Sequence, residues 1–214
     1  MKLSMSEFLQ DIVAIPSAAP NEGKLVDYLQ TAFESIGCIV EKQLIDANRY
    51  NLFISRGKGT RAILFYGHID TVDITDISAW KYDPFTLTAE GEKLYGLGAY
   101  DMKGGIAAIY NALIQTDSYA KVFLAVDEEY ISTGAWKAVQ ERKDFFTDVD
   151  LIISAEPAFG LGMNGLTIGR TGRCLFNLDI KGKPAHIAEY TKGVDAIKIL
   201  SDKITHFYTN RDEM

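Results

Sequence analysis

Acidic residues and a histidine recur in this chain where apolar runs give way to polar ones. A histidine and an aspartate follow the run 62–66, two glutamates follow 122–126, and another glutamate follows 151–153. An aspartate also precedes the helical pattern that begins at residue 103. Successive groups stand about 30 residues apart, the length of a βα unit, so we expect them at one edge of a sheet, where α/β proteins bind ligands. The residues are His68, Asp70, Asp101, Glu128, Glu129 and Glu156.

Several carboxylates gathered at an apolar sheet edge would repel one another strongly. A divalent cation removes that repulsion, and a donor set of imidazole and carboxylates without thiolate suits zinc, cobalt or manganese. Any one of these side chains taken alone is better explained as a solvated residue at the end of a strand. The regular spacing of the whole set instead predicts a metal site.

The spacing within each group predicts separate roles for its members. His68 and Asp70 are two residues apart, so in extended chain they share a face, and Asp70 can accept the distal N–H of the imidazole and fix its tautomer. Glu128 and Glu129 are adjacent, so their side chains diverge. One of them can bind metal while the other holds a water molecule.

The elements that must position these residues alternate along the chain up to about residue 157. The runs 62–66, 122–126 and 151–153 are apolar throughout, as strands covered on both faces are. Apolar residues recur at helical spacing in 103–115 and 135–146. The sequence therefore predicts an α/β fold, a mostly parallel sheet with helices on both faces.

The pattern changes after Pro157. Residues 166–168 and 174–180 alternate as half-buried antiparallel strands do, and 194–208 has the periodicity of an amphipathic helix. We therefore expect an α/β domain over residues 1–163 and part of a smaller α+β domain over 164–214.

Composition and charge exclude several classes of function. The 214 residues carry 22 basic and 29 acidic side chains, a net charge of −7, so nucleic acid and anionic membranes are poor candidates as partners. The two cysteines, Cys38 and Cys174, are far apart and form no CxxC pattern, which fits a reducing compartment. The first 17 residues resemble an amphipathic helix rather than a signal peptide, and no apolar run approaches the ~20 residues that span a bilayer. We expect a soluble cytoplasmic protein.

A glycine pattern offers a competing interpretation. Residues 160–165 match G-x-G-x-x-G after an apolar run, as in dinucleotide-binding proteins. That motif must open a helix, whereas residues 166–169 have the character of a strand. We interpret the segment as a loop.

Taken together, these motifs resemble a known family. The sequence is similar to the dinuclear zinc metallopeptidases and deacylases that include acetylornithine deacetylase, succinyl-diaminopimelate desuccinylase, aminoacylase and carboxypeptidase G. The resemblance covers nearly the whole chain, with the motifs in the same order. The matching segments are 67–72 (GHIDTV), 95–105 (YGLGAYDMKGG), 127–129 (DEE), 156–157 (EP), 182–186 (GKPAH) and 193–197 (GVDAI).

The resemblance implies a zinc-exopeptidase-like catalytic domain, a lid domain and two divalent metal ions, zinc first with cobalt or manganese as alternatives. His68 would bind one metal and Asp101 would bridge both. Glu129 and Glu156 would be terminal ligands. Two metals can activate a water molecule and stabilise a tetrahedral oxyanion together, which suits amide hydrolysis.

The resemblance also assigns roles in catalysis. Asp70 would orient His68, and Glu128 would be the general base that deprotonates the attacking water and later protonates the leaving amine. His186 would reach from the lid into the site of a partner subunit and polarise the substrate carbonyl, although it could also be an exposed loop residue. Arg170 would bind a substrate carboxylate.

The implied protein is a homodimeric amide hydrolase that releases an amino acid from an N-acyl amino acid or cleaves a small peptide. Two departures qualify this: Leu97 stands where the family usually has arginine, and the chain stops within the lid, before the family's last histidine ligand. His206, on the helical stripe 194–208 but off its apolar face, reads as a surface residue. The sequence thus leaves open a fragment of a longer enzyme, a single-metal hydrolase, or an inactive binding or dimerisation protein.

Overall fold

The computed structural model describes residues 3–158, 165–169 and 177–210. The chain divides into two compact units, Met1–Ile168 and Gly169–Met214. The domain boundary expected at residues 163 and 164 falls outside the described residues, so it stays a prediction. The first unit holds the sheet and the predicted site.

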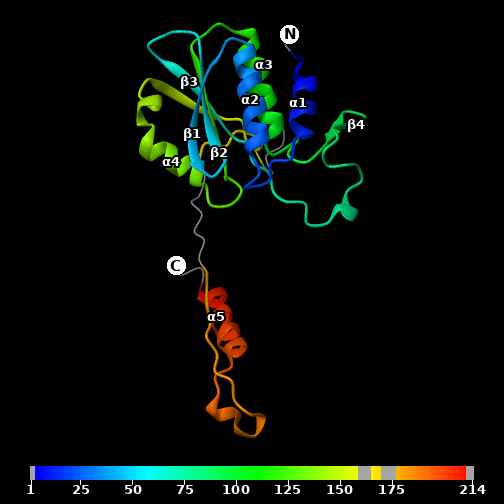
Figure 1. Ribbon diagram of the computed structural model, residues 1–214, viewed down its shortest axis with the longest axis vertical. Helices are drawn as coiled ribbons and strands as arrows, with labels where there is room; N and C mark the ends of the chain where they lie inside the picture. The colour runs from blue at the N-terminus through cyan, green and yellow to red at the C-terminus, as the bar shows by residue number, and fades with distance from the viewer. Residues whose placement is uncertain (1–2, 159–164, 170–176, 211–214) are drawn as a thin grey trace. The chain divides into compact units, whose positions relative to one another are not determined.

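Among the described residues of the first unit, two α-helices come first and are followed by five strands, and helices alternate with strands only from residue 103 onwards (Figure 1). The α-helices there and in the second unit are α1 (Met5–Val13), α2 (Gly23–Ser35), α3 (Lys103–Gln115), α4 (Thr133–Glu141) and α5 (Ala196–Asn210). The 3₁₀ helices are η1 (Ile77–Ala79), η2 (Lys143–Phe146) and η4 (Ile187–Lys192). The strands are β1 (Ile39–Asp46), β2 (Arg49–Arg56), β3 (Ala62–His68), β4 (Thr88–Glu90), β5 (Lys93–Tyr95), β6 (Ala120–Ala125) and β7 (Val149–Ser154).

The main sheet has the order β1-β2-β6-β3-β7. Strands β6, β3 and β7 are parallel, whereas β2 runs antiparallel to both β1 and β6. The predicted α/β class is therefore confirmed, with the qualification that the sheet is mixed, because an antiparallel hairpin extends its parallel part. The short strands β4 and β5 form a separate hairpin.

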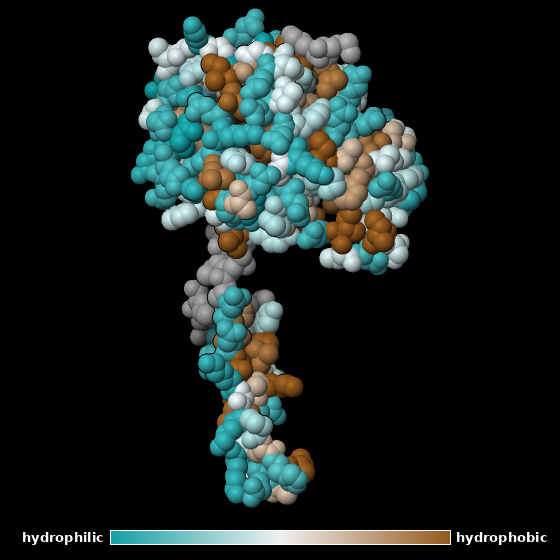
Figure 2. Space-filling view, viewed as in Figure 1, coloured by the Kyte–Doolittle hydropathy of each residue, from teal (hydrophilic) through white to brown (hydrophobic). Residues whose placement is uncertain are grey.

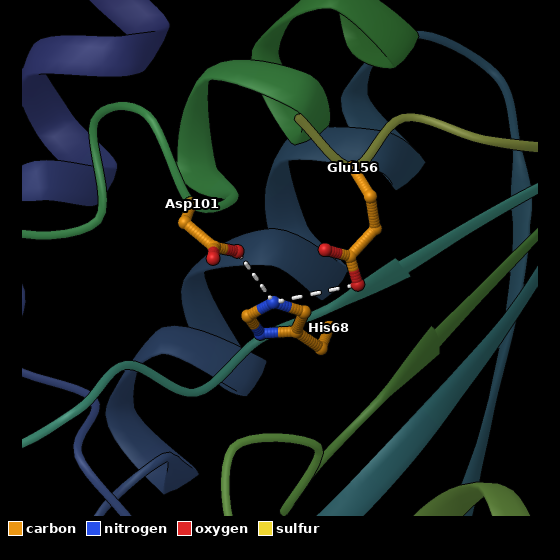
Figure 3. Close-up of side chains that lie close together, drawn as sticks. All are labelled: His68, Asp101 and Glu156. Atoms are coloured by element: carbon orange, nitrogen blue, oxygen red, sulfur yellow. Dashed lines mark hydrogen bonds and ion pairs between the residues drawn. The ribbon is translucent and has the colours of Figure 1, made fainter. Parts of the chain in front are cut away.

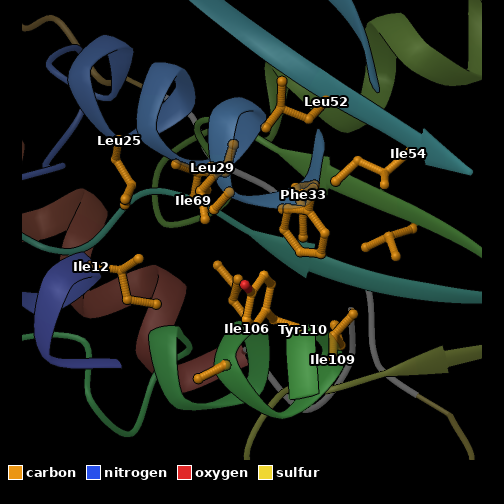
Figure 4. Close-up of a cluster of buried hydrophobic side chains, with 14 of the residues drawn as sticks. Ile12, Leu25, Leu29, Phe33, Leu52, Ile54, Ile69, Ile106, Ile109 and Tyr110 are labelled. Atoms are coloured by element: carbon orange, nitrogen blue, oxygen red, sulfur yellow. The ribbon is translucent and has the colours of Figure 1, made fainter. Parts of the chain in front are cut away.

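One face of the sheet is covered by α1, α2 and α3 (Figure 1). Their apolar stripes meet Leu52 and Ile54 of β2 in the largest core of the molecule, shown in Figure 4. Within it the rings of Phe8 and Tyr110 stack with centroids 4.1 Å apart. This core fixes α3, and hence the loop that precedes it, against the sheet.

Local sequence explains where the first two helices begin and end. Ser4 caps α1 by accepting the N–H of Glu7, whose carboxylate accepts the N–H of Ser4 in return. Helix α2 is followed by Gly37 at φ +87°, a left-handed conformation that glycine adopts without the steric cost of a Cβ.

The opposite face of the sheet carries a smaller aromatic core. Phe53 of β2 and Phe123 of β6 stack with centroids 4.9 Å apart, and Phe145 and Phe146 of η2 meet them edge-on. Helices thus cover both faces of the sheet at β2 and β6, as the apolar run 122–126 predicted. The prediction that the run 151–153 is covered on both faces is wrong, because β7 stands at the edge of the sheet with these side chains exposed. The alternation of Leu52, Phe53 and Ile54 between the two cores explains why β2 is apolar throughout.

The second unit differs from the strands expected there. Residues 166–168 have no regular structure, and neither do the described residues of the expected strand 174–180. The amphipathic helix does form, as α5, but none of its apolar side chains is buried, and most of them are exposed. In Figure 2 apolar side chains gather along one side of this unit. Alternation alone cannot make a strand, because a strand also needs a neighbour to pair with.

None of the helices in the described ranges is both long and apolar enough to cross a membrane.

Candidate metal centre

The predicted site residues lie where the parallel strands end. His68 is the last residue of β3 and pairs with Ala125 at the end of β6, while Tyr66 pairs with Ser154 at the end of β7. Glu156 follows β7 by two residues. The three parallel strands therefore bring chain segments nearly 90 residues apart to one edge, as the spacing predicted.

Three of the predicted ligands form a close group, shown in Figure 3. The Nε2 atom of His68 lies 3.0 Å from Asp101 Oδ1 and 3.7 Å from Glu156 Oε1. One ligand atom from each residue lies within 4.8 Å of the others. The His68 side chain is fully buried, and the side chains of Asp101 and Glu156 are 29% and 13% exposed. A buried imidazole facing two carboxylates is a donor set that fits a divalent cation.

The tautomer of His68 is fixed differently from the prediction. Its Nδ1 lies 2.9 Å from the main-chain carbonyl oxygen of Asp70 and 3.6 Å from the Asp70 carboxylate. Because a carbonyl oxygen only accepts, Nδ1 carries the proton and donates it, which leaves Nε2 facing Asp101 and Glu156 as a ligand atom. The main chain of Asp70, rather than its carboxylate, makes the closer contact with the imidazole.

The carboxylate of Asp70 instead holds the loop that carries the two glutamates. Its oxygens accept the main-chain N–H groups of Glu128 and Glu129 at 3.1 and 3.0 Å. Burial alone would raise the pKa of Asp70, but the neighbouring His68 imidazole and the hydrogen bonds from these N–H groups outweigh burial and lower it. Asp70 therefore stays ionised while it joins the end of β3 to the loop after β6.

The electrostatics of the group favour positive charge at its centre. Burial lowers the pKa of His68, but the hydrogen bonds and charges of Asp101, Asp70 and Glu156 outweigh it and raise the pKa to about 10. A proton on the imidazole relieves the repulsion between the carboxylates in the metal-free molecule. A bound divalent cation would relieve it with twice the charge.

Glu129 lies outside the close group of three. Burial, followed by the charge of Asp101, raises its pKa, so the Glu129 carboxylate faces the same acidic site from a greater distance. Glu128 is its neighbour on the loop held by Asp70. The structure thus brings together three predicted ligands and sets the two glutamates beside them.

A buried ionic group behind this loop was not predicted. Arg49 Nη2 lies 2.8 Å from Glu22 Oε1 and 3.0 Å from Asp127 Oδ1, with all three side chains at most 8% exposed. Asp127 has a left-handed φ of +69° and directly precedes Glu128. The position of Asp127 in the acidic run 127–129 could have indicated a charged group here. No local sequence pattern indicates that Arg49 of β2 would be its partner.

The start of α3 is packed against the other site segments. A Cβ at Gly104 would collide with the carbonyl oxygen of Ala99, and one at Gly105 with that of Ala155, next to Glu156. Met102, joined to Asp101 by a cis peptide bond, accepts the main-chain N–H of His68 on its sulfur at 3.0 Å. These close approaches hold the Asp101 segment against those of His68 and Glu156.

The remaining predicted residues belong to the second unit or lie outside the described residues. His186 is exposed, and its Nδ1 accepts the N–H of Ala188 at the start of η4. His206 is exposed on α5, in agreement with its interpretation as a surface residue. Arg170, Cys174 and residues 160–164 of the glycine pattern lie outside the described residues.

Comparison with known proteins identifies the family. Residues 64–209 match peptidase family M20/M25/M40. The chain belongs to this family. Among M20 relatives, acetylornithine deacetylase of Proteus mirabilis (strain HI4320) is 31% identical over 224 residues, which cover 97% of this chain and 55% of that protein. The chain spans about half the length of the curated relatives it matches.

Solved structures of the M20 fold resemble the chain at lower identity. An M20 metallo-carboxypeptidase of Sulfolobus solfataricus has a TM-score of 0.64 and 20% identity, over 71% of this chain and 37% of that one. A tripeptidase of Staphylococcus aureus subsp. aureus mu50 has a TM-score of 0.63 and 19% identity, over 96% of this chain and 56% of that one. These likenesses establish the fold, in agreement with the resemblance found in the motifs.

Proposed function

We propose that this M20 chain is the metal-binding part of an amide hydrolase that releases an amino acid from an N-acyl amino acid or cleaves a small peptide. The close group of His68, Asp101 and Glu156 carries the proposal, because buried donors of this kind are suited to a divalent cation. The acetylornithine deacetylase relatives favour a deacylase of the acetylornithine type, and the succinyl-diaminopimelate type is the other deacylase that the motifs resemble.

The metal roles are proposed residue by residue. His68 and Glu156 would hold one zinc ion, Asp101 would bridge to a second, and Glu129 would be a ligand of that second ion. When bound, the ions supply an activated water molecule and stabilise the oxyanion. The position of Glu129 beside the close group, with its pKa raised by burial and by the charge of Asp101, supports this division.

The other residues would move protons and bind substrate. Glu128 would accept the proton of the attacking water and return it to the leaving amine. Asp70 supports this role, since its carboxylate holds the main chain of Glu128 in place. His186 would polarise the substrate carbonyl in a partner subunit of a homodimer, and Arg170 would bind a substrate carboxylate.

The test measures metal content and turnover of the full-length enzyme separately. His68→Ala should lower zinc occupancy, because it removes the buried donor at the centre of the group. Glu128→Gln should keep the metal and lower kcat on an N-acetyl amino acid by about 10²–10⁴, the contribution of a positioned base. Glu92→Gln, an exposed glutamate on the β4–β5 hairpin, is the matched control. Full occupancy in His68→Ala, or unchanged turnover in Glu128→Gln, would contradict the assigned roles.

Metal stoichiometry distinguishes the two alternatives. A single-metal hydrolase is favoured by one observation, namely that only three of the four proposed ligands form the close group. One equivalent of zinc with full activity would support it, two equivalents would support the dinuclear site, and no zinc would point to an inactive binding protein.

A further inference from the structure

The loop that carries Glu128 and Glu129 is held from behind by two polar side chains of β2. Residues 126–132 form this loop and join β6 to α4. Arg49 and Asn51 are two residues apart on β2, so their side chains lie on the same face of that strand. Both side chains are buried. Neither has a role in the proposed chemistry, so their contacts with the loop need an explanation of their own.

Asn51 joins the two ends of the loop. Its side-chain Oδ1 accepts the main-chain N–H of Val126 at 3.2 Å, and its Nδ2 donates to the main-chain carbonyl of Gly134 at 2.8 Å. A Cβ at Gly134 would lie 2.5 Å from Asn51 Oδ1 and 2.4 Å from the carbonyl oxygen of Val126, closer than such atoms can approach. These contacts fix the points where the chain leaves β6 and enters α4.

Asp127 closes the turn between these two points. Its main-chain carbonyl accepts the N–H of Ser132 at 2.7 Å, and its Oδ2 accepts the N–H and the hydroxyl of Thr133 at 3.2 and 2.7 Å. Asp127 and Ser132 have φ angles of +69° and +58°, a left-handed conformation that is unfavourable for residues other than glycine. Such conformations persist only where surrounding contacts hold them. The turn that presents Glu128 and Glu129 therefore depends on the contacts of Asp127.

Arg49 joins Asp127 to the segment that leads into α2. Its Nη2 lies 3.0 Å from Asp127 Oδ1, and its Nε and Nη2 donate to the carboxylate of Glu22 at 2.8–3.2 Å. Because a guanidinium holds its donors in a rigid plane, it fixes the two carboxylates relative to each other. Taking such charges out of water costs about as much free energy as their attraction returns, so stability alone explains this buried group poorly.

Residues 15–22, which lie between α1 and α2 and end at the partner of Arg49, contact the other site segments as well. The carbonyl of Ser17 accepts the N–H of Thr71, after β3, at 3.2 Å. The carbonyl of Ile15 accepts Nζ of Lys103, the first residue of α3, at 2.8 Å. The buried ionic group therefore ties the loop of the two glutamates to a segment that also contacts the segments of the other proposed ligands.

We propose that Arg49 and Asp127 are positioning residues, which hold Glu128 and Glu129 in the orientation in which they act as base and metal ligand. Asp70 holds the main chain of both glutamates from the side of the metal centre. Arg49, acting through Asp127, holds the same loop from the opposite side. Neither positioning residue would touch substrate or metal. This inference rests on the proposed function for the roles of the two glutamates.

The main test is Asp127→Asn in the full-length enzyme. This substitution leaves one oxygen where the carboxylate has two, so the side chain can accept from Arg49 or from Thr133 but not from both. Zinc titration of the metal-free enzyme by calorimetry should show the second equivalent binding about 10- to 100-fold more weakly than in wild type, with the first unchanged. At saturating zinc, kcat on an N-acetyl amino acid should fall about 10- to 100-fold. KM should change little, because no group that contacts the substrate is removed.

Two further comparisons separate positioning from stability. Ile54→Ala removes fully buried apolar atoms from the same strand and lowers the free energy of unfolding, but it should leave zinc affinity and kcat as in wild type. Arg49→Met should weaken the second zinc ion as Asp127→Asn does. Arg49→Lys should recover most of that loss, because an ammonium group can still donate to both carboxylates. Equal losses in Ile54→Ala and Asp127→Asn, or no loss in Asp127→Asn, would overturn the positioning role.

Hydrogen exchange of the metal-free enzyme separates this inference from the proposed function. The N–H groups of Glu128 and Glu129 donate to Asp70, so they exchange when the loop opens. We expect both to exchange about 10-fold faster in Asp127→Asn than in wild type, and at the wild-type rate in Ile54→Ala, which affects unfolding of the whole unit. If no N-acetyl amino acid is hydrolysed but exchange responds in this way, the proposed function fails and the positioning of the loop stands. Unchanged exchange in Asp127→Asn, or an equal rise in both variants, would overturn it.

Discussion

The two edges of the main sheet are built from different kinds of strand. Strand β1, which pairs only with β2 among the described strands, carries charged side chains outward, and Lys42 and Glu41 pair with Asp27 and Arg142. Strand β7 pairs only with β3 among the same strands. Its consecutive apolar residues Leu151, Ile152 and Ile153 are 51%, 60% and 40% exposed.

The two edge strands show that the amino-acid composition of a strand does not always match its position in the sheet. Charges along β1 are what an exposed edge strand needs to discourage pairing with another chain. The run Leu151–Ile153 has instead the composition of a strand covered on both faces. An interior strand therefore stands at an edge position, and the two ends of the sheet should respond differently to the same kind of substitution.

Truncation of a large apolar side chain should give the largest difference in stability between the interior of the sheet and its β7 edge. Phe53→Ala on β2 removes a ring that is 1% exposed and contacts three other phenylalanines. We expect it to lower the free energy of unfolding by about 3–5 kcal/mol. Ile152→Ala on β7 should lower it by about 1 kcal/mol or less, because that side chain is mostly exposed. Urea unfolding of the 214-residue chain measures both, and equal losses would contradict the contrast.

Removing one partner of a charged pair should also lower the free energy of unfolding more in the buried interior than on β7. The difference should be smaller than for the apolar side chains. Glu22→Gln leaves Arg49 without its main partner in a buried group, and we expect a loss of about 3 kcal/mol in the free energy of unfolding. Asp150→Asn on β7 removes a pair with Arg61 whose side chains are 64% and 46% exposed, and surface pairs contribute about 0–1 kcal/mol. Thermal or urea unfolding at low salt compares them. A larger loss in Asp150→Asn would mean that the β7 edge is more tightly held than its exposure indicates.

Self-association tests the exposed edge directly. We expect the 214-residue chain to associate through β7 as concentration rises, because an apolar edge strand offers unpaired main-chain groups to a second copy. Ile152→Lys should reduce this association several-fold in sedimentation velocity, whereas Ile39→Lys on β1 should change it little. Equal effects of the two substitutions would show that another surface is responsible.

At the start of β7 we expect a smaller effect, a contribution to stability that depends on pH. Hydrogen bonds from Lys121 and Tyr119 lower the pKa of Asp148, the residue before β7. A carboxylate with a lowered pKa stabilises the fold above its unfolded pKa of about 3.9, and this contribution is lost as pH falls below that value. Asp148→Asn should therefore be less stable than wild type at pH 7, and the difference should shrink towards pH 3 in urea unfolding. A difference independent of pH would indicate a role in packing instead of charge.

The sequence predicts much of the first unit because several independent signals agree there. The runs 62–66 and 122–126 and the helix at 103–115 all form, and spacing alone anticipated that His68, Asp101 and Glu156 converge. The insertion of β2 beside β6 was not predictable, since periodicity reports the faces of a strand but not its neighbours. Asp70 illustrates the same limit, because residue type does not reveal whether a carbonyl or a carboxylate meets the imidazole.

The residue that can stand at position 105 is limited by the chain segment at Ala155, which packs against it. The main chain of Gly105 lies so close to the carbonyl of Ala155 that every larger residue would displace the segment leading to Glu156. Ala108 and Ala112 on the outer face of the same helix are exposed and meet no such constraint. Engineers who wish to alter this helix can therefore substitute residues along its outer face, whereas a substitution of Gly105 in its first turn would move Glu156, a proposed ligand that lies 51 residues further along the chain.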